Sequence, residues 1–116
     1  PAHQQHQVRV QLAASLQGIC TQQLLQTPDG QGRVLAAEVL VATPAVRNLI
    51  REGKIYQIYS LMQTGAKFGM LTMDQHLAQL VRAQRITMEA ACERCASEDD
   101  LRRLVQSGGG SNEWAA

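Results

Sequence analysis

The stretch "GRVLAAEVLVATPAVRNLI", residues 32–50, contains the point at which a predicted strand gives way to a helix. Residues 33–42 are nearly continuous in apolar side chains, as in a strand covered on both faces, with Glu38 as the exception. Thr43 and Pro44 then form a helix start, because the threonine hydroxyl can accept a backbone N–H and proline has none to leave unpaired. We therefore expect a buried strand followed directly by a helix.

The residues upstream of this strand predict its hairpin partner. The segment "ICTQQLLQ", residues 19–26, has the length and apolar content of a strand. The turn that follows contains residues that supply the restricted and positive φ angles needed for a chain reversal, namely Pro28, Asp29, Gly30 and Gly32. We therefore expect a short β-hairpin.

A helix is expected before the hairpin, because apolar residues recur at three- and four-residue spacing near the start of the chain. They are Val8, Leu12, Leu16 and Ile19, and they predict one buried face. Gly18 is expected to end this helix.

The chain after Pro44 is expected to form only helices. The first should end near Gly53, and residues 54–70 repeat the helical spacing as a second helix. Further helices are predicted to start at Thr72, Thr87 and Ser97. Thr72 is followed three residues later by Gln75, which is the capping-box spacing. Helices this short are marginal alone, so we expect them to pack against one another.

The predicted fold class is mainly α with a short β-hairpin. Residues 1–43 hold the first helix and the hairpin, and residues 44–107 form a helical part. Residues 108–116 are rich in glycine and serine, as a flexible tail is, and include Trp114.

The composition limits the classes of function. A chain of 116 residues that is 45% apolar and 18% charged is typical of one globular domain. A net charge of +1 provides no field that would favour nucleic acid or an anionic membrane surface. No apolar run approaches the roughly 20 residues that cross a bilayer, so we expect no membrane insertion.

Three cysteines, with no apolar signal segment, favour a reducing compartment over a disulfide framework. Cys92 and Cys95 form a C-x-x-C pair, but a zinc site needs four ligands and the chain offers no second paired spacing. The other candidate ligands are Cys20, His3, His6 and His76. We predict no metal site and no catalytic residue, and the role of the three cysteines stays open.

The helix expected to begin at Pro44 is amphipathic, with an apolar side and a polar side. Its apolar side chains lie at i, i+3 and i+4, which predicts a buried stripe of Val46, Leu49 and Ile50. The same spacing places Arg47, Asn48, Arg51 and Glu52 on the surface. The spacing alone leaves two interpretations open, a solvated helix face or a binding face.

The segment "ATPAVRNLIREGK", residues 42–54, closely resembles the Ala-Ile-Arg-Asn-Leu-Ile-Arg-Glu motif of the type IV pilus retraction ATPases, the PilT (twitching motility) family. Val46 in place of isoleucine is the one change within the motif. "VRVQLAASLQGICTQQLL" and "MQTGAKFGMLTMDQHLAQLV" are similar to other segments of the same family. The resemblance covers roughly residues 4–105, which is nearly the whole chain.

This resemblance implies the C-terminal helical subdomain of a RecA-like α/β P-loop ATPase, truncated before the Walker motifs. It also implies that the motif binds a partner during retraction. The residues concerned are Ala45, Val46, Arg47, Asn48, Leu49, Ile50, Arg51 and Glu52. The sequence contains no G-x-x-x-x-G-K-[ST] loop, so the chain by itself is expected to be inactive as an ATPase.

By resemblance, the complete protein is a cytoplasmic homo-hexamer at the inner-membrane base of the pilus. ATP and Mg²⁺ are the cofactors that the family implies, and neither is expected on this chain alone. The implied partners are the neighbouring subunits and the pilus platform protein. The expected function is to couple ATP hydrolysis to pilus disassembly and twitching motility, and the alternative is a stand-alone helical interaction or adaptor module.

Overall fold

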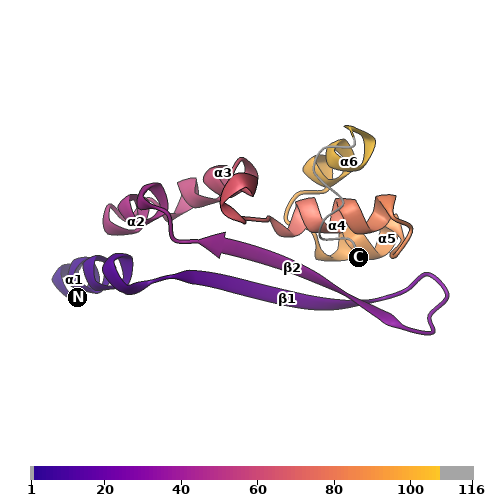
Figure 1. Ribbon diagram of the computed structural model, residues 1–116, viewed down its shortest axis with the longest axis horizontal. Coiled ribbons are helices and arrows are strands. Elements are labelled where there is room, and N and C mark those ends of the chain that lie inside the picture. The colour runs from indigo at the N-terminus through magenta and orange to yellow at the C-terminus, as the bar shows by residue number, and fades with distance from the viewer. Residues whose placement is uncertain (1, 108–116) are drawn as a thin grey trace. The chain divides into compact units, whose positions relative to one another are not determined.

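The computed structural model describes residues 2–107, which form mainly helices and a two-stranded hairpin (Figure 1). The predicted fold class is therefore confirmed, while the predicted tail with Trp114 lies outside the described residues. The first elements are α1 (Ala2–Ser15), β1 (Gly18–Gln26), β2 (Arg33–Val41) and α2 (Pro44–Arg51). They are followed by η1 (Ile55–Gln57), α3 (Ile58–Gln63), η2 (Ala66–Phe68), α4 (Met73–Arg82), α5 (Met88–Arg94) and α6 (Glu98–Ser107).

Three of the helices after the hairpin, α2, α4 and α5, begin where a threonine side chain caps them. The Thr43 hydroxyl accepts the amide of Val46 at 3.3 Å, which starts α2. Thr72 and Gln75 form a reciprocal capping box at the start of α4, with bonds of 3.1 and 3.0 Å. Thr87 caps α5 in the same way. Because these bonds join residues three apart, the sequence was sufficient to predict them.

The residues divide into two compact units, and the hairpin contributes strand residues to both. The first unit comprises residues 2–20 and 39–71, and the second comprises residues 21–38 and 72–107. The core of the first unit contains Ala13, Val46, Ile50, Ile58, Met62 and Met70. The core of the second contains Leu25, Val34, Ala36, Met73, Leu77, Ala78, Leu80, Ile86, Ala91 and Leu101. Each unit thus has an apolar core of its own.

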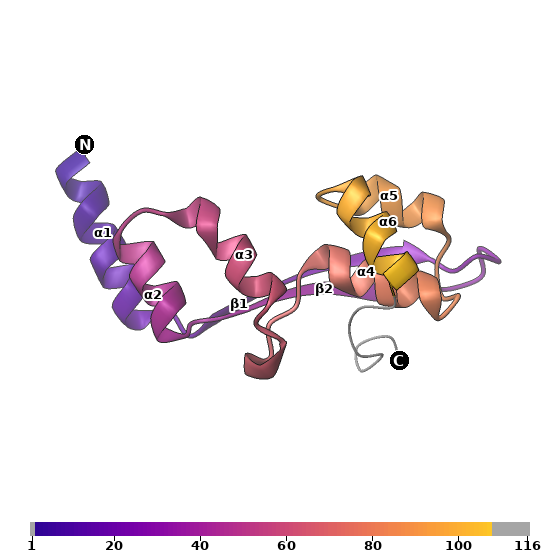
Figure 2. The ribbon, with the colours of Figure 1, turned by 90° about the horizontal axis from the view of Figure 1, so that it is seen from above.

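In the first unit, α1 and α2 lie side by side in both views (Figures 1 and 2). The second helix expected over residues 54–70 is shorter than predicted, because α3 is flanked by the single 3-10 turns η1 and η2. Gly65 follows α3, and the chain doubles back there so tightly that an added Cβ would lie 2.9 Å from the Met70 sulfur. Gly69 then adopts φ 86°, in the left-handed region that favours glycine.

Two expectations about burial were wrong. The apolar residues predicted to form a buried face near the start of the chain are largely exposed, with Val8 at 60% and Leu12 at 45%. On β2, Leu35 is 43% exposed although its neighbours Val34 and Ala36 are buried. The physical reason is that the apolar pattern of a segment does not reveal whether another element covers it.

No helix within residues 2–107 has the length and apolar content needed to span a membrane.

Candidate partner-binding site

Helix α2 carries the eight residues of the candidate site, and packing separates them into two sides. Val46 and Ile50 are buried in the core of the first unit, and Leu49 is half-buried against it. Ala45, Asn48, Arg51 and Glu52 are exposed. The helix therefore holds an apolar side inside the unit and presents a mainly polar side to solvent, as the spacing predicts.

Arg47 has a contact that the sequence did not reveal. Its side chain is half-buried, and Nη1 donates a hydrogen bond of 2.7 Å to the backbone oxygen of Ala13. Ala13 lies in the last turn of α1, where carbonyl groups lack partners within the helix and the helix dipole favours a positive charge. Arg47 therefore attaches α2 to the C-terminal end of α1, which is a structural role in this chain.

The exposed side of α2 forms a chain of polar contacts. Arg51 donates to the Asn48 side-chain oxygen at 3.5 Å, and Asn48 donates through Nδ2 to Glu52 at 3.2 Å. Glu52 also pairs with Lys54 at 3.1 Å. All of these side chains are exposed, so such pairs contribute little to stability. They leave an ordered polar surface that another molecule can contact.

Two surface hollows in the first unit adjoin α2. One, of about 490 Å³, is lined by Ala45, Asn48, Leu49, Gln57, Ser60 and Leu61. The other, of about 290 Å³, is an almost wholly apolar groove lined by Leu12, Leu16, Ile19, Leu40, Ile50, Ile55, Ile58, Tyr59 and Met62. Three of the eight motif residues thus reach the first hollow, and Ile50 reaches the second.

The three cysteines within residues 2–107 are free and lie in different surroundings. Cys20 is exposed, whereas Cys92 and Cys95 are half-buried beside the second core. Burial, with a smaller contribution from the carboxylate of Asp74, raises the pKa of the Cys95 thiol, which disfavours the nucleophilic thiolate. In this part of the chain no three histidine, cysteine or acidic side chains are grouped to hold a metal ion.

The histidines are spread over the chain. His6 is exposed on α1, and the side chain of His3 lies outside the described part of the structure. His76 is buried in the second unit, where Nδ1 accepts the amide of Ala37 at 2.8 Å. This geometry requires Nδ1 to be unprotonated and gives His76 a structural role.

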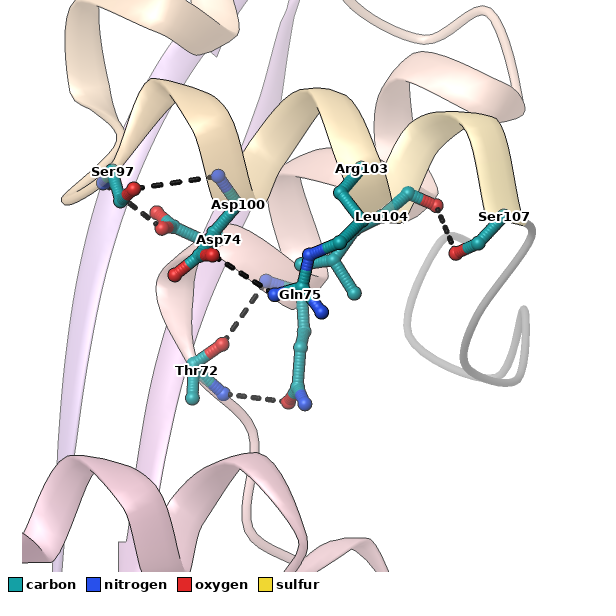
Figure 3. Close-up of polar contacts among 8 residues, drawn as sticks. All are labelled: Thr72, Asp74, Gln75, Ser97, Asp100, Arg103, Leu104 and Ser107. Atoms are coloured by element: carbon teal, nitrogen blue, oxygen red, sulfur yellow. Dashed lines mark hydrogen bonds and ion pairs between the residues drawn. The ribbon is translucent and has the colours of Figure 1, made fainter.

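Asp74 is also buried, and unlike His76 it was not among the candidate residues of the sequence analysis. Its two carboxylate oxygens accept the amides of Ala96 at 2.8 Å and Ser97 at 3.1 Å. Figure 3 shows the carboxylate of Asp74 facing Ser97, whose hydroxyl in turn accepts the amide of Asp100. Asp74 on α4 thus anchors the chain at the start of α6. The only sequence signal was an acid in the first turn after a capping threonine.

Several known proteins are similar in sequence to this chain over most of its length. No family model matches the chain. The chain is 50% identical over 101 residues to a twitching motility protein of Neisseria gonorrhoeae, a match that covers 87% of this chain and 27% of that protein. It is 46% identical over 94 residues to the type IV pilus retraction ATPase PilT of Pseudomonas aeruginosa, covering 81% of this chain and 27% of that protein.

The similarity extends to a second ATPase and to a solved structure. The type IV pilus ATPase PilU of Pseudomonas aeruginosa is 40% identical over 112 residues, covering 97% of this chain and 29% of that protein. The crystal structure of the pilus retraction motor PilT with bound ADP superimposes with a TM-score of 0.76 at 47% identity, over 89% of this chain and 28% of that chain. The chain spans less than a third of the length of these relatives.

Proposed function

The chain belongs to the PilT family of type IV pilus retraction ATPases, and from this premise we propose that it is a C-terminal portion of a retraction motor. In the complete protein, ATP hydrolysis by a hexamer is coupled to pilus disassembly and hence to twitching motility. The portion described here contributes the helical subdomain that passes motion on to the pilus base. The main support is 50% identity to a twitching motility protein over 87% of the chain.

The cofactor and the location follow from the same proposal. The complete protein binds ATP with Mg²⁺ at a site outside this portion, and the ADP in the related PilT structure supports a nucleotide as the ligand. The motor works in the cytoplasm at the inner-membrane base of the pilus. Its partners are the neighbouring subunits of a homo-hexamer and the pilus platform protein.

Within this portion, we propose that residues 45–52 contact the partner during retraction. Buried Val46 and Ile50 hold α2 in place, and Arg47 ties it to α1. This arrangement supports a division of roles, in which Asn48, Arg51 and Glu52 form the contact surface.

The test uses the full-length protein that carries this chain. Replacing Asn48 and Arg51 with alanine should leave oligomer formation and ATP hydrolysis intact and abolish pilus retraction, because only the coupling contact is lost. Arg102→Ala is the matched control, since Arg102 is an exposed helical arginine of α6 that pairs with Glu98. Normal twitching in the double variant would contradict the proposal.

A coding frame without a G-x-x-x-x-G-K-[ST] loop upstream of this chain would instead favour a stand-alone adaptor module.

A further inference from the structure

We infer that Cys92 and Cys95 form a redox-active thiol pair, which a low-molecular-weight disulfide oxidises to a disulfide between the two residues. Both cysteines are free and half-buried, so each is partly accessible to a small reagent. The pair belongs to the second unit and the proposed partner-binding surface to the first, so this inference does not rest on the proposed function. Disulfides of this kind in reducing compartments are transient and serve redox sensing or catalysis.

The backbone brings the two cysteines to a separation that a disulfide can span. Cys92 lies in α5, and Cys95 follows the helix as its C-cap, with its amide bonded to the Ala91 carbonyl at 3.0 Å. Residues three apart in a helix have Cα atoms about 5 Å apart, within the disulfide range of about 4.4 to 6.8 Å. The Cys95 side chain also turns back toward Cys92, because its Sγ donates a hydrogen bond of 3.3 Å to the Cys92 carbonyl oxygen. The fold therefore holds both thiols at one helical turn, where they can react with each other.

The two sulfurs have neighbours of opposite charge, which gives them different roles. Nη2 of Arg102 on α6 lies 4.0 Å from Sγ of Cys92, and it also pairs with Glu98 at 2.7 Å. A neighbouring guanidinium stabilises the negative charge of an attacking sulfur and is typical of reactive cysteines. At Cys95, burial and, to a smaller extent, the carboxylates of Asp74 and Glu98 raise the pKa of the thiol. Cys92 is therefore the attacking residue, and Cys95 closes the disulfide.

The oxidation consists of two thiol–disulfide exchange steps. The Cys92 thiolate attacks one sulfur of the external disulfide, which forms a mixed disulfide and releases the other half as a thiolate. Cys95 then loses its proton to solvent and its sulfur attacks the Cys92 sulfur, which releases the second half. The two protein thiols are thereby oxidised, the external disulfide is reduced, and the two protons end on the two small thiols. Because the second step takes place within one molecule, proximity offsets the raised pKa of Cys95.

The first experiment measures how strongly the fold promotes the disulfide. The 116-residue chain, folded by circular dichroism, is equilibrated with mixtures of glutathione and glutathione disulfide, and the same is done in urea. Alkylation and peptide mass spectrometry then give the fractions of thiol and disulfide at Cys92 and Cys95, and hence the effective concentration of one thiol toward the other. We expect this concentration to be at least fivefold higher in the folded chain than in urea. An equal or lower value in the folded chain would overturn the inference.

The second experiment tests the roles of the two cysteines with glutathione disulfide as the oxidant. Cys95→Ser should stop at a mixed disulfide on Cys92, because the residue that closes the disulfide is missing. Cys92→Ser should form a mixed disulfide on Cys95 at least fivefold more slowly. Cys20, which is exposed, is the internal control and should react at the same rate in both variants. Equal rates at Cys92 and Cys95 would contradict the assignment of Cys92 as the attacking residue.

The contribution of Arg102 is tested in the same reaction. Arg102→Ala should slow the reaction of Cys92 at least threefold relative to that of Cys20, because the positive charge beside the sulfur is lost. Arg103→Ala is the matched control, since Arg103 is an exposed arginine of the same helix that pairs with Asp100. Equal rates at Cys92 in the two variants would show that Arg102 does not promote the attack and would overturn that part of the inference.

Discussion

Arg47 and Arg51 lie one helical turn apart on α2, but they have different partners. Arg47 is half-buried and binds the Ala13 carbonyl of α1, whereas Arg51 is exposed and contacts Asn48 of its own helix. Like charges at this spacing repel mildly in an isolated helix, and the attachment of Arg47 to a helix C-terminus offsets that effect. The two arginines therefore have separable roles, one structural and one available to a partner.

Arg47→Ala should lower the free energy of unfolding by roughly 1 to 2 kcal/mol, because it removes a hydrogen bond from a charged group to a carbonyl at a helix end. Arg51→Ala should leave that free energy nearly unchanged. Urea unfolding of the two variants of this chain, followed by circular dichroism, measures the difference. Equal destabilisation by both substitutions would show that Arg47 has no special role in holding α1.

At the scale of elements, the path of the chain after α3 depends on one glycine. A Cβ at Gly65 would lie 2.9 Å from the Met70 sulfur, closer than real Cβ contacts, and 3.0 Å from the Leu61 backbone oxygen, which is also tight. This close approach permits the chain to double back after α3 and bury Met70 in the first core.

Gly65→Ala should therefore destabilise the chain by roughly 1 to 3 kcal/mol through overpacking, and hydrogen exchange should accelerate first in α3. Gly32→Ala is the control, because a Cβ there would meet only Thr27 at 3.8 Å. Mass-resolved hydrogen exchange checks the location of the effect. If α3 stays as protected in Gly65→Ala as in Gly32→Ala, the close approach is not required.

Asp74 on α4 accepts the amides of Ala96 and Ser97, the two residues directly before α6. Asp74→Ala leaves both amides without that acceptor, and the loss of such a helix-end contact typically costs about 1 to 3 kcal/mol. Amide exchange at residues 96 and 97 should therefore accelerate more than exchange in α2, which belongs to the other unit. Asp99→Ala, at an exposed residue of α6, is the control and should leave both regions unchanged. Uniform acceleration in both units would contradict a local role for Asp74.

At the scale of the whole molecule, the described residues form two units with separate cores, and the candidate site belongs entirely to the first. The residues of this chain do not include a phosphate-binding loop. We therefore propose that partner contact and nucleotide chemistry belong to different parts of the motor.

The 116-residue chain alone should not bind ATP in isothermal titration calorimetry, since backbone amides that cradle phosphates and acids that hold Mg²⁺ are needed for the nucleotide. The full-length protein that contains the chain is the positive control and should bind. Micromolar affinity of the short chain would show a nucleotide site that no motif in it predicts.

Local chemistry by itself determined the starts of α2, α4 and α5, the hairpin and the division of α2 into two sides. The bonds from Thr43 to Val46 and from Thr72 to Gln75 join residues three apart, so neither depends on where the chain travels next. The resemblance to the retraction motif was likewise visible in eight consecutive residues, and a twitching motility protein and a pilus retraction ATPase are 50% and 46% identical to the chain.

Only the tertiary structure decided which side chains meet across long stretches of sequence. Arg47 and Ala13 are 34 positions apart, and His76 and Ala37 are 39 apart, so no periodicity within one helix could pair them. The same holds for the hollow that Asn48 lines, because Gln57 and Ser60 reach Asn48 only after the chain turns between α2 and α3. Sequence spacing specifies the face of a helix, whereas the fold specifies what that face contacts.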